Sequence, residues 1–475
     1  MAFDLKLSTL SKTQRDSILK NLMVKPAATQ YEPNPIASPC FIVDKANDTV
    51  ALPLGVWQQY LTVFPNGDAD TYDKMNPNVK FTKSLLTVDT DSSGRKRDQD
   101  VIAKQALSQL YKNGFVFLAI MTGGGKTLLS IYLSIILGLK TVILSHLNII
   151  KEQWAEEYQI SGKNVKIQFL NKPNIKLDPT ADVYIVGIHK AMSADLNEFI
   201  DIGTVIIDEA HIATVTAFTQ TLFKFRPRYL IGLSATPDRN DGLHSLFNFY
   251  FGSCDDFIIR KEKKPFTVYK VETDFEPIID YNIIKGRQTV NWNTVVQSIE
   301  ENPKRWQLIA DIAINNINEQ IIILCNRKIL SKGVYNILIK NGQDVELLIE
   351  NKKNWNRNAR VIVAGLKKAG VGLDLPKLTM GIIASDTKDA RQYEGRIRKQ
   401  NSILYHIVDH YRSLHNHYKE CEKFYIEKGA TVVKINKGHI LAEKYYYKYL
   451  LLKYFDILID IKSVILTYFI ETFEY

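Results

Sequence analysis

The sequence predicts an α/β protein built from two domains, each with a parallel sheet. The first observation is a series of strand-length apolar runs between residues 115 and 234, separated by segments long enough for helices. A second series of the same kind follows between residues 321 and 409. The composition agrees, because 45% apolar and 24% charged residues are ordinary values for a globular protein. This alternation is typical of parallel sheets with helices on both faces.

The individual strands are predicted from short apolar runs rich in Val, Ile and aromatic residues, which are too short for helices. In the first series they are FVFLAI at 115–120, TVILS at 141–145, VYIVGI at 183–188, TVIID at 204–208 and YLIGLS at 229–234. In the second series they are IIILC at 321–325, ARVIVAG at 359–365, MGIIAS at 380–385 and ILYHIVD at 403–409.

Composition also divides the rest of the chain. A proline-punctuated start followed by the polar stretch DTDSSGRKRDQD predicts a boundary near residue 95. The strand pattern pauses after Arg239, and the Tyr-, Leu- and Ile-rich end predicts a helical tail packed on the second domain. The predicted division is an N-terminal accessory module at 1–95, a first domain at 96–255, a connection at 256–300, a second domain at 301–436 and the tail at 437–475.

Charge and cysteine content indicate the environment of the protein. A formal charge of +10 is compatible with a polyanionic partner and equally with an ordinary solvated surface. The sequence shows neither a basic-then-apolar leader nor an apolar run of about 18 residues. We therefore expect a soluble intracellular protein without membrane contact. A reducing compartment and no structural zinc are expected because no C-x-x-C pair or clustered histidine accompanies Cys40, Cys254, Cys325 and Cys421.

The segment FVFLAIMTGGGKTLLSIYLSIIL has the strand, loop and helix order that phosphate binding requires. Glycines let backbone N–H groups point at phosphates, and the following helix starts with its positive dipole end there. Lys126 adds a charge for the β- and γ-phosphates, and Thr127 adds a hydroxyl for Mg²⁺. A glycine-rich loop without nucleotide is the alternative, because Ile120 stands where the strict P-loop pattern has its first glycine. The candidate nucleotide-binding residues are Thr122, Gly123, Gly124, Gly125, Lys126 and Thr127.

A second apolar strand ends in two acids within VIIDEAH at 205–211. Asp208 is placed to hold Mg²⁺, directly or through water, and Glu209 to orient and polarise the attacking water. The alternative is a surface turn with two solvated acids. Because the pair follows the glycine-rich loop within one predicted domain, we expect Lys126, Asp208 and Glu209 to serve ATP hydrolysis, with ATP and Mg²⁺ as cofactors.

Four motifs in this order resemble the superfamily 2 helicases with a DEAH box: GGGKT at 123–127, DEAH at 208–211, SAT at 234–236 and Q-x-x-G-R at 392–396. SATPDRNDGL, ILSHLNIIKEQW and AGVGLDLPKL are similar to the branch of XPB-like and phage repair helicases. In general appearance the chain resembles helicases of large nucleocytoplasmic DNA viruses. The resemblance covers about residues 95–435 and implies two tandem RecA-like P-loop domains that close on ATP.

The resemblance implies a cation from the second domain at the γ-phosphate. Arg396 matches the arginine of the family motif, and such a contact is worth about 10³ to 10⁵ in rate elsewhere. The family pattern G-R-x-x-R would place a second arginine at 399, where this sequence has Lys399, with Arg398 one residue earlier. Either Lys399 or Arg398 is then the second cation.

Further roles also follow from the resemblance. Asp374 matches an acid that contacts nucleotide in relatives. Gln99 is either the glutamine that reads adenine or part of a charged linker. The residues expected to couple hydrolysis to domain movement are His211, Ser234, Thr236 and Gln392.

Polynucleotide contacts are implied at 146–151, 187–190 and 365–370, through backbone N–H groups, hydroxyls and lysines. Trp154, Trp292, Trp306 and Trp355 either stack on bases or belong to the cores. DNA is the favoured polymer, and RNA stays open. Transcription or replication machinery is a candidate partner, no oligomeric state is indicated, and a viral protein of this kind is expected in the host cytoplasm or nucleus.

The leading functional hypothesis is an ATP-dependent nucleic-acid helicase or translocase. One alternative is a translocase that remodels protein–nucleic acid or transcription complexes without unwinding a duplex. The other is a catalytically dead nucleic-acid clamp, against which the intact Lys126, Asp208 and Glu209 argue.

Overall fold

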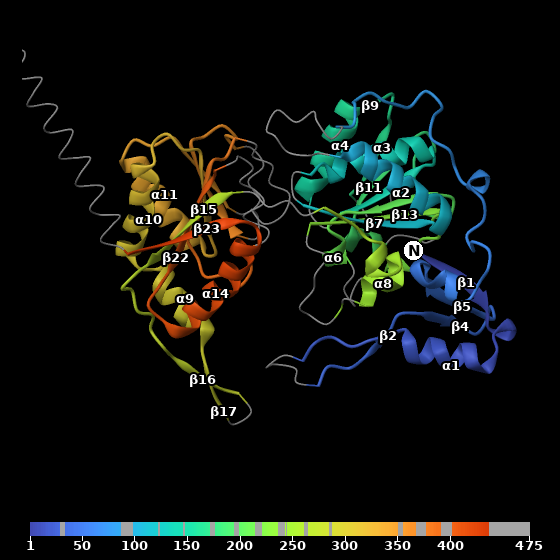
Figure 1. The fold of residues 1–475 in the computed structure, drawn as a ribbon, viewed down its shortest axis with the longest axis horizontal. Coiled ribbons are helices and arrows are strands. Elements are labelled where there is room, and N and C mark those ends of the chain that lie inside the picture. Colours follow the sequence, from blue (N-terminus) through green and yellow to red (C-terminus); the bar gives the residue numbers. More distant parts are fainter. Residues whose placement is uncertain are drawn as a thin grey trace, which may run out of the picture. The chain divides into compact units, whose positions relative to one another are not determined.

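The computed structural model describes two compact units, Met1–Glu262 and Lys263–Tyr475 (Figure 1). Each unit contains one seven-stranded sheet. The described residues are 1–28, 34–86, 98–121, 124–145, 148–171, 176–193, 199–213, 221–235, 243, 245–260, 265–284, 287–349, 355–366, 377–390 and 401–436.

The sheet of the first unit has the strand order β10-β11-β8-β12-β13-β7-β14, and all of its pairings are parallel. Each of the five runs predicted here is a strand within one residue of its predicted bounds. Every residue of β7 and β13 is buried, as expected for strands covered on both faces. The strands are β7 (Phe115–Ile120), β8 (Thr141–Ser145), β10 (Ile167–Leu170), β11 (Val183–Gly187), β12 (Thr204–Ile207), β13 (Tyr229–Ser234) and β14 (Ile258–Arg260).

Helices cover both faces of this sheet. The helices α2 (Gln99–Asn113), α3 (Lys126–Leu137) and α4 (Asn148–Ser161) pack on one face. The other face carries α8 (Ser245–Phe251) together with the short helices α5 (Ile188–Ala191) and α6 (Ala210–Ala213). Both α2 and α3 end at a left-handed glycine, Gly114 and Gly138, which is the usual helix stop.

The N-terminal segment shares the hydrophobic core of this second face. Its strands β1 (Ala2–Lys6), β5 (Thr49–Pro53) and β4 (Ile42–Asp44) form an antiparallel sheet in that order. Phe3 and Leu54 belong to the same cluster of buried residues as Phe117 of β7 and Phe247 of α8. Figure 1 shows these strands beside α8. The described residues of the accessory module predicted at 1–95 therefore share the core of the first unit, which corrects the predicted separation of this module from the first domain.

The remaining elements of the first unit are short, apart from α1, whose cap Ser11 forms a reciprocal capping box with Gln14. They are η1 (Leu7–Thr9), α1 (Lys12–Asn21), β2 (Met23–Val24), β3 (Ser38–Pro39), η2 (Leu54–Gln59), η3 (Ala69–Thr71), β6 (Lys80–Phe81), β9 (Gly162–Lys163) and η5 (Cys254–Asp256).

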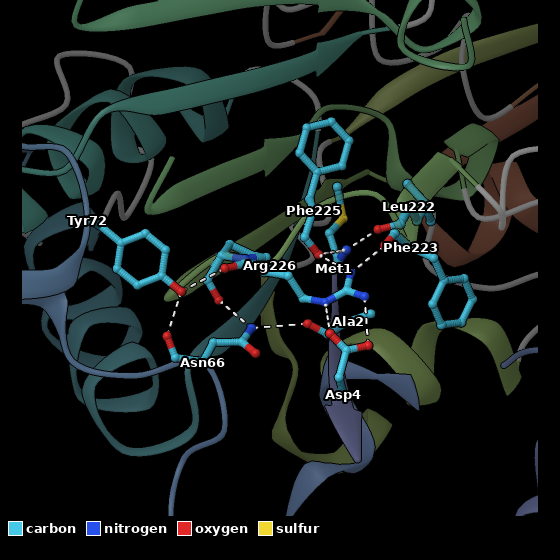
Figure 2. A network of polar contacts seen from close by, with 10 residues as sticks. Met1, Ala2, Asp4, Asn66, Tyr72, Leu222, Phe223, Phe225 and Arg226 are labelled. Atoms are coloured by element: carbon cyan, nitrogen blue, oxygen red, sulfur yellow. Dashed lines mark hydrogen bonds and ion pairs between the residues drawn. The ribbon is translucent and has the colours of Figure 1, made fainter. Parts of the chain in front are cut away.

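Polar contacts tie β1 to the stretch of chain that leads into β13 (Figure 2). The Met1 amino group donates to the carbonyls of Leu222 and Phe225. Arg226 donates to both carboxylate oxygens of Asp4, at 2.7 and 2.8 Å. Two parallel bonds of this kind fix orientation as well as distance. These contacts therefore fix β1 against the stretch of chain that precedes β13, the strand that ends at Ser234.

The sheet of the second unit has the order β19-β20-β18-β21-β22-β15-β23 and is also entirely parallel. All four runs predicted here are strands, three of them one or two residues shorter than predicted. The strands are β15 (Phe266–Glu272), β18 (Ile321–Cys325), β19 (Val345–Leu348), β20 (Val361–Gly365), β21 (Met380–Ile383), β22 (Ile403–Val408) and β23 (Ala430–Asn436).

Helices α10 (Pro303–Asn315) and α11 (Lys328–Lys340) pack on one face of this sheet, and α14 (Arg412–Glu427) packs on the other. The helix α10 begins with Pro303 after the cap Asn302, whose side chain accepts from the Lys304 N–H. Two parallel-sheet domains with helices on both faces confirm the predicted fold class. The predicted tail at 437–475 lies outside the described residues.

The structure corrects the connection predicted at 256–300. Strand β14 is an edge strand of the first sheet, and β15 is an inner strand of the second. Between β15 and α9 (Trp292–Glu300) lies a hairpin of β16 (Tyr281–Ile284) and β17 (Arg287–Val290), which Figure 1 shows projecting from the second unit. The prediction failed because β15, FTVYKVE, alternates buried and half-buried residues and contains no continuous apolar run.

Within the described part of the chain, no helix has both the length and the apolar character needed to cross a membrane. The four cysteines carry free thiols, and three of them are buried.

Asn66 is predicted to stabilise the first unit through the contacts of its side-chain amide. Its Nδ2 donates to the carbonyls of Ala2 and Pro227 at 3.1 and 2.9 Å. Figure 2 also shows Tyr72, whose hydroxyl lies 2.6 Å from the Asn66 carbonyl. Asn66→Ala leaves two carbonyls without this donor and should lower the free energy of unfolding by about 1–3 kcal/mol.

The measurement is urea unfolding of the full chain. Asn47→Ala is the matched control, because its Nδ2 bonds only to the neighbouring Asp44 on the surface. Equal unfolding midpoints for the two variants would contradict the prediction.

Candidate functional site

The predicted site residues of the first unit gather at one edge of its sheet. Strands β7, β13 and β12 are neighbours and run in parallel, so their carboxyl ends meet at the same edge. The glycine-rich loop follows β7, Ser234 ends β13, and Asp208 and Glu209 follow β12. Segments that are about 80 residues apart in the sequence are thereby brought together.

The described part of the glycine-rich loop is a tight turn that leads directly into α3. Gly125 has φ +87°, a left-handed conformation that glycine adopts without strain, and it precedes the first residue of α3. The Gly124 N–H donates to the Met121 carbonyl at 3.0 Å. Lys126 donates from Nζ to the Ile120 carbonyl at 2.8 Å, which folds its side chain back along the loop. Thr127 is half-buried in the first turn of α3.

Gln99 lies against this loop and is only 2% exposed. Its Nε2 is 3.5 Å from the Gly124 carbonyl, and its Oε1 accepts from the Leu86 N–H at 3.1 Å. A Cβ at Gly125 would overlap the Gln99 amide and displace that side chain from the loop, and the φ of +87° by itself favours glycine at this position. The structure therefore places Gln99 at the loop and excludes a solvated charged linker at this position.

The acid pair stands at the end of β12 in a strained turn. Glu209 has φ +48°, which is unfavourable for a non-glycine residue and is typical of functional sites. Its N–H donates to Asp208 Oδ1 at 3.0 Å, and Trp154 Nε1 donates to Asp208 Oδ2 at 2.8 Å. Both oxygens of Asp208 therefore have fixed donors.

Burial and the negative charge of Glu209 raise the pKa of Asp208 above the ordinary value for aspartate. The bond from Trp154 and the positive charge of Lys126 oppose this rise. Lys126 thus lies close enough to Asp208 for their charges to interact. Two adjacent acids that repel each other beside a cation form an environment that a divalent cation would stabilise.

His211 connects the acid pair to the end of β13. Its Nδ1 lies 3.1 Å from Ser234 Oγ and 3.4 Å from Glu209 Oε2. Two of the four residues expected to couple hydrolysis to movement, His211 and Ser234, are therefore in direct contact. Their role in coupling stays a prediction.

Two of the segments expected to contact polynucleotide meet farther along the same edge. Lys151 on α4 is 5% exposed and donates from Nζ to Asn171 Oδ1 at 2.9 Å. The Nζ also lies beside Gly187 at the end of β11. Burial, together with the nearby charge of Lys190, lowers the pKa of Lys151. The third segment starts at Gly365, which ends β20 in the second unit.

The tryptophans are part of the packed structure. Trp154 is 1% exposed, which excludes base stacking in this conformation. Trp306 Nε1 donates to the Glu300 carbonyl at 2.7 Å, and Trp355 packs on the core of the second unit. The ring of Trp292 lies 5.0 Å from that of His417. These contacts favour the core interpretation over base stacking.

Several predicted site residues lie outside the described residues. They are Thr122 and Gly123 of the loop, Thr236, Asp374, Gln392, Arg396, Arg398 and Lys399.

The described residues fit a nucleotide with Mg²⁺. A magnesium ion is usually held by one or two protein oxygens together with substrate phosphates and water, so a cage of protein ligands is not required. Thr127 Oγ1 at the start of α3 and the Asp208 carboxylate at the end of β12 supply oxygens of the required chemistry at this edge. The loop N–H groups and Lys126 are suited to the phosphates.

Two contacts of the site were not predicted from the sequence: Trp154 with Asp208, and Lys151 with Asn171. A buried tryptophan usually finds an acceptor for its N–H, which is a signal that an acceptor exists. The identity of that acceptor depends on long-range packing, because 54 residues separate Trp154 from Asp208.

Comparison with known proteins identifies relatives of this chain. Residues 93–239 match the family model described as "Type III restriction enzyme, res subunit". "Putative helicase 161L" of Invertebrate iridescent virus 6 is 29% identical, with 75% of this chain and 86% of that protein covered. "Putative helicase 109L" of Invertebrate iridescent virus 3 is 31% identical, with 46% of this chain and 68% of that protein covered.

Among solved structures, S. cerevisiae Dbp5 bound to RNA and ADP BeF3 has a TM-score of 0.51, with 73% of this chain and 92% of that chain covered. At 12% identity this likeness concerns the fold alone. It confirms the two RecA-like domains. The chain belongs to the superfamily 2 helicases with a type III restriction enzyme res-subunit domain, which are ATP-hydrolysing, nucleic-acid-dependent enzymes.

Proposed function

We propose that the chain is an ATP-dependent helicase or translocase of the DEAH-box, XPB-like branch, with DNA as its favoured polymer. The observation that carries the proposal is the meeting of Lys126 and Thr127 with Asp208 and Glu209 at the carboxyl edge of the first sheet. Polynucleotide-dependent hydrolysis requires both a phosphate site and a strand site. A buried lysine and two predicted contact segments lie along the same edge.

The residues of the edge divide the chemistry among them. The loop N–H groups and Lys126 bind and orient the phosphates, and Glu209 orients the attacking water. Mg²⁺, held by Thr127 and Asp208, would neutralise charge on the β- and γ-phosphate oxygens. His211 contacts both Glu209 and Ser234, so a change in the position of Glu209 during hydrolysis would reach the end of β13. Gln99 bonds to both Leu86 and Gly124 and thereby holds the glycine-rich loop in place. Its proposed role is to bind the adenine base of the nucleotide.

The second domain supplies the remaining charges in this proposal. Arg396, with Arg398 or Lys399, reaches the γ-phosphate, and Asp374 contacts the nucleotide. Gln392 and Thr236 join His211 and Ser234 in coupling. Transcription or replication machinery stays a candidate partner, and the preference for DNA rests on the branch resemblance.

The direct test is ATP hydrolysis by the full chain with and without single- and double-stranded DNA and RNA. We expect stimulation by at least one polymer, and by DNA most strongly. Displacement of a labelled strand then separates unwinding from translocation alone. Hydrolysis that no polymer stimulates would contradict the proposal, and stimulation without displacement would favour the remodelling translocase.

Glu209→Gln is predicted to reduce stimulated hydrolysis by about 10²- to 10⁴-fold, the usual contribution of a positioned base. The amide keeps the shape of the side chain and cannot take a proton, so binding of a fluorescent ATP analogue should persist. Lys126→Ala should weaken that binding instead. Glu301→Gln is the control, since Glu301 is exposed and bonds only within its own helical turn. Wild-type hydrolysis by Glu209→Gln would refute the assignment.

Lys190 is exposed beside the buried Lys151 and is predicted to contact phosphate. Each phosphate contact contributes about 0.7 to the slope of the logarithm of single-strand affinity against the logarithm of salt concentration. Lys190→Ala should therefore reduce the slope by about that amount. Fluorescence anisotropy at several salt concentrations measures it. Lys20→Ala on α1 removes an equal charge from an exposed site, and an identical slope for both variants would contradict the contact.

A further inference from the structure

One buried face of α4 carries three polar-tipped side chains in succession. They are Lys151, Trp154 and Tyr158, which are 5%, 1% and 0% exposed. Spacings of three and four residues place them on the same side of the helix. The rings of Trp154 and Tyr158 are 6.2 Å apart. Trp154 and Tyr158 are thus in ring contact, and Lys151 lies one turn earlier on the same face.

Each tip bonds to a different part of the site. Lys151 Nζ donates to Asn171 Oδ1 at 2.9 Å, next to the predicted polynucleotide segment at 187–190. Trp154 Nε1 donates to Asp208 Oδ2 at 2.8 Å. The Tyr158 hydroxyl lies 2.7 Å from Ser134 Oγ on α3, the helix that begins at Lys126. A single helix thus touches the predicted strand site, the acid of the acid pair and the phosphate-binding helix.

The indole contact is the one that bears on chemistry. The indole N–H can only donate, and the Trp154 ring is rigid and buried. It therefore fixes the position of Asp208 Oδ2. The other oxygen, Oδ1, accepts from the Glu209 N–H. A shift of α4 would therefore move the donor of one carboxylate oxygen and leave the donor of the other in place. The Asp208 carboxylate, which would hold the metal, would then rotate.

We propose that Trp154 is a positioning residue that couples polynucleotide contact at the first turns of α4 to the orientation of Asp208. This proposal rests on the proposed function, because it requires both ligands to bind. A polynucleotide phosphate at the exposed Lys190 changes the charge interaction with the buried Lys151 and displaces α4, and the indole carries the displacement to the Asp208 carboxylate. The coupling is reciprocal, so bound nucleotide changes polynucleotide affinity by the same factor.

The test is a thermodynamic cycle on the full chain. Affinity for a fluorescein-labelled single strand, of whichever polymer stimulates hydrolysis, is measured with and without saturating ADP, beryllium fluoride and Mg²⁺. The ratio of the two affinities is the coupling factor, which is typically about 5 to 150 in allosteric proteins. Each variant is compared with itself, so changes in either single affinity cancel.

Trp154→Phe should reduce the coupling factor to below about 2. Trp57→Phe is the matched control in the same unit, because Trp57 is also buried and its Nε1 donates at 2.8 Å to the Asn113 carbonyl, away from the site. It should retain the wild-type factor. Trp154→Phe with a wild-type factor would overturn the proposal.

A second substitution at position 154 separates loss of the indole N–H from loss of packing in Trp154→Phe. Benzothienylalanine at position 154 keeps the bicyclic shape and replaces the N–H by sulfur, so packing is preserved while the donor is lost. It should also abolish the coupling, and retained coupling would overturn the proposal. A wild-type chain that neither couples the ligands nor shows stimulated hydrolysis would instead refute the proposed function. Stimulated hydrolysis without coupling in the wild type would overturn only the role of Trp154.

Discussion

The parallel pairing of β7, β13 and β12 is the constraint on which the rest of the site depends. Parallel strands end at one edge, so Lys126, Ser234 and Asp208 can meet only if these strands are neighbours in register. The buried apolar residues of β7 and β13 hold that register from both faces. Because β13 lies between the other two strands, His211 can reach Ser234 while remaining beside Glu209. The chemistry of the edge is therefore a consequence of strand order.

The N-terminal segment acts on the same strand from its opposite end. The contacts of Met1, Asp4 and Asn66 all fall on the stretch that enters β13, and the shared core includes α8, which follows that strand in the chain. Contacts at both ends restrain a buried strand more than contacts at one end. The N-terminal segment therefore helps to hold β13 in the position that places Ser234 beside His211 and the acid pair.

Much of the fold could be predicted from sequence, because continuous runs such as IIILC leave a strong local signal. The edge strand β14 and the alternating strand β15 could not, since their apolar residues are too few or too widely spaced. In the site, Lys126, Asp208, Glu209, His211 and Ser234 were recognisable because their motifs are local. The bond from Trp154 to Asp208 and the shared N-terminal core depend on contacts between distant segments, and a single sequence does not show which segments will meet.

The central claim is that the edge formed by β7, β13 and β12 is a site for nucleotide with Mg²⁺. A crystal structure of the full chain with ADP, beryllium fluoride and Mg²⁺ tests it most directly. The account predicts phosphate density against Gly124, Gly125 and Lys126, with the metal between Thr127 Oγ1 and the Asp208 carboxylate. Nucleotide bound elsewhere, or a metal that Asp208 does not approach directly or through water, would contradict it.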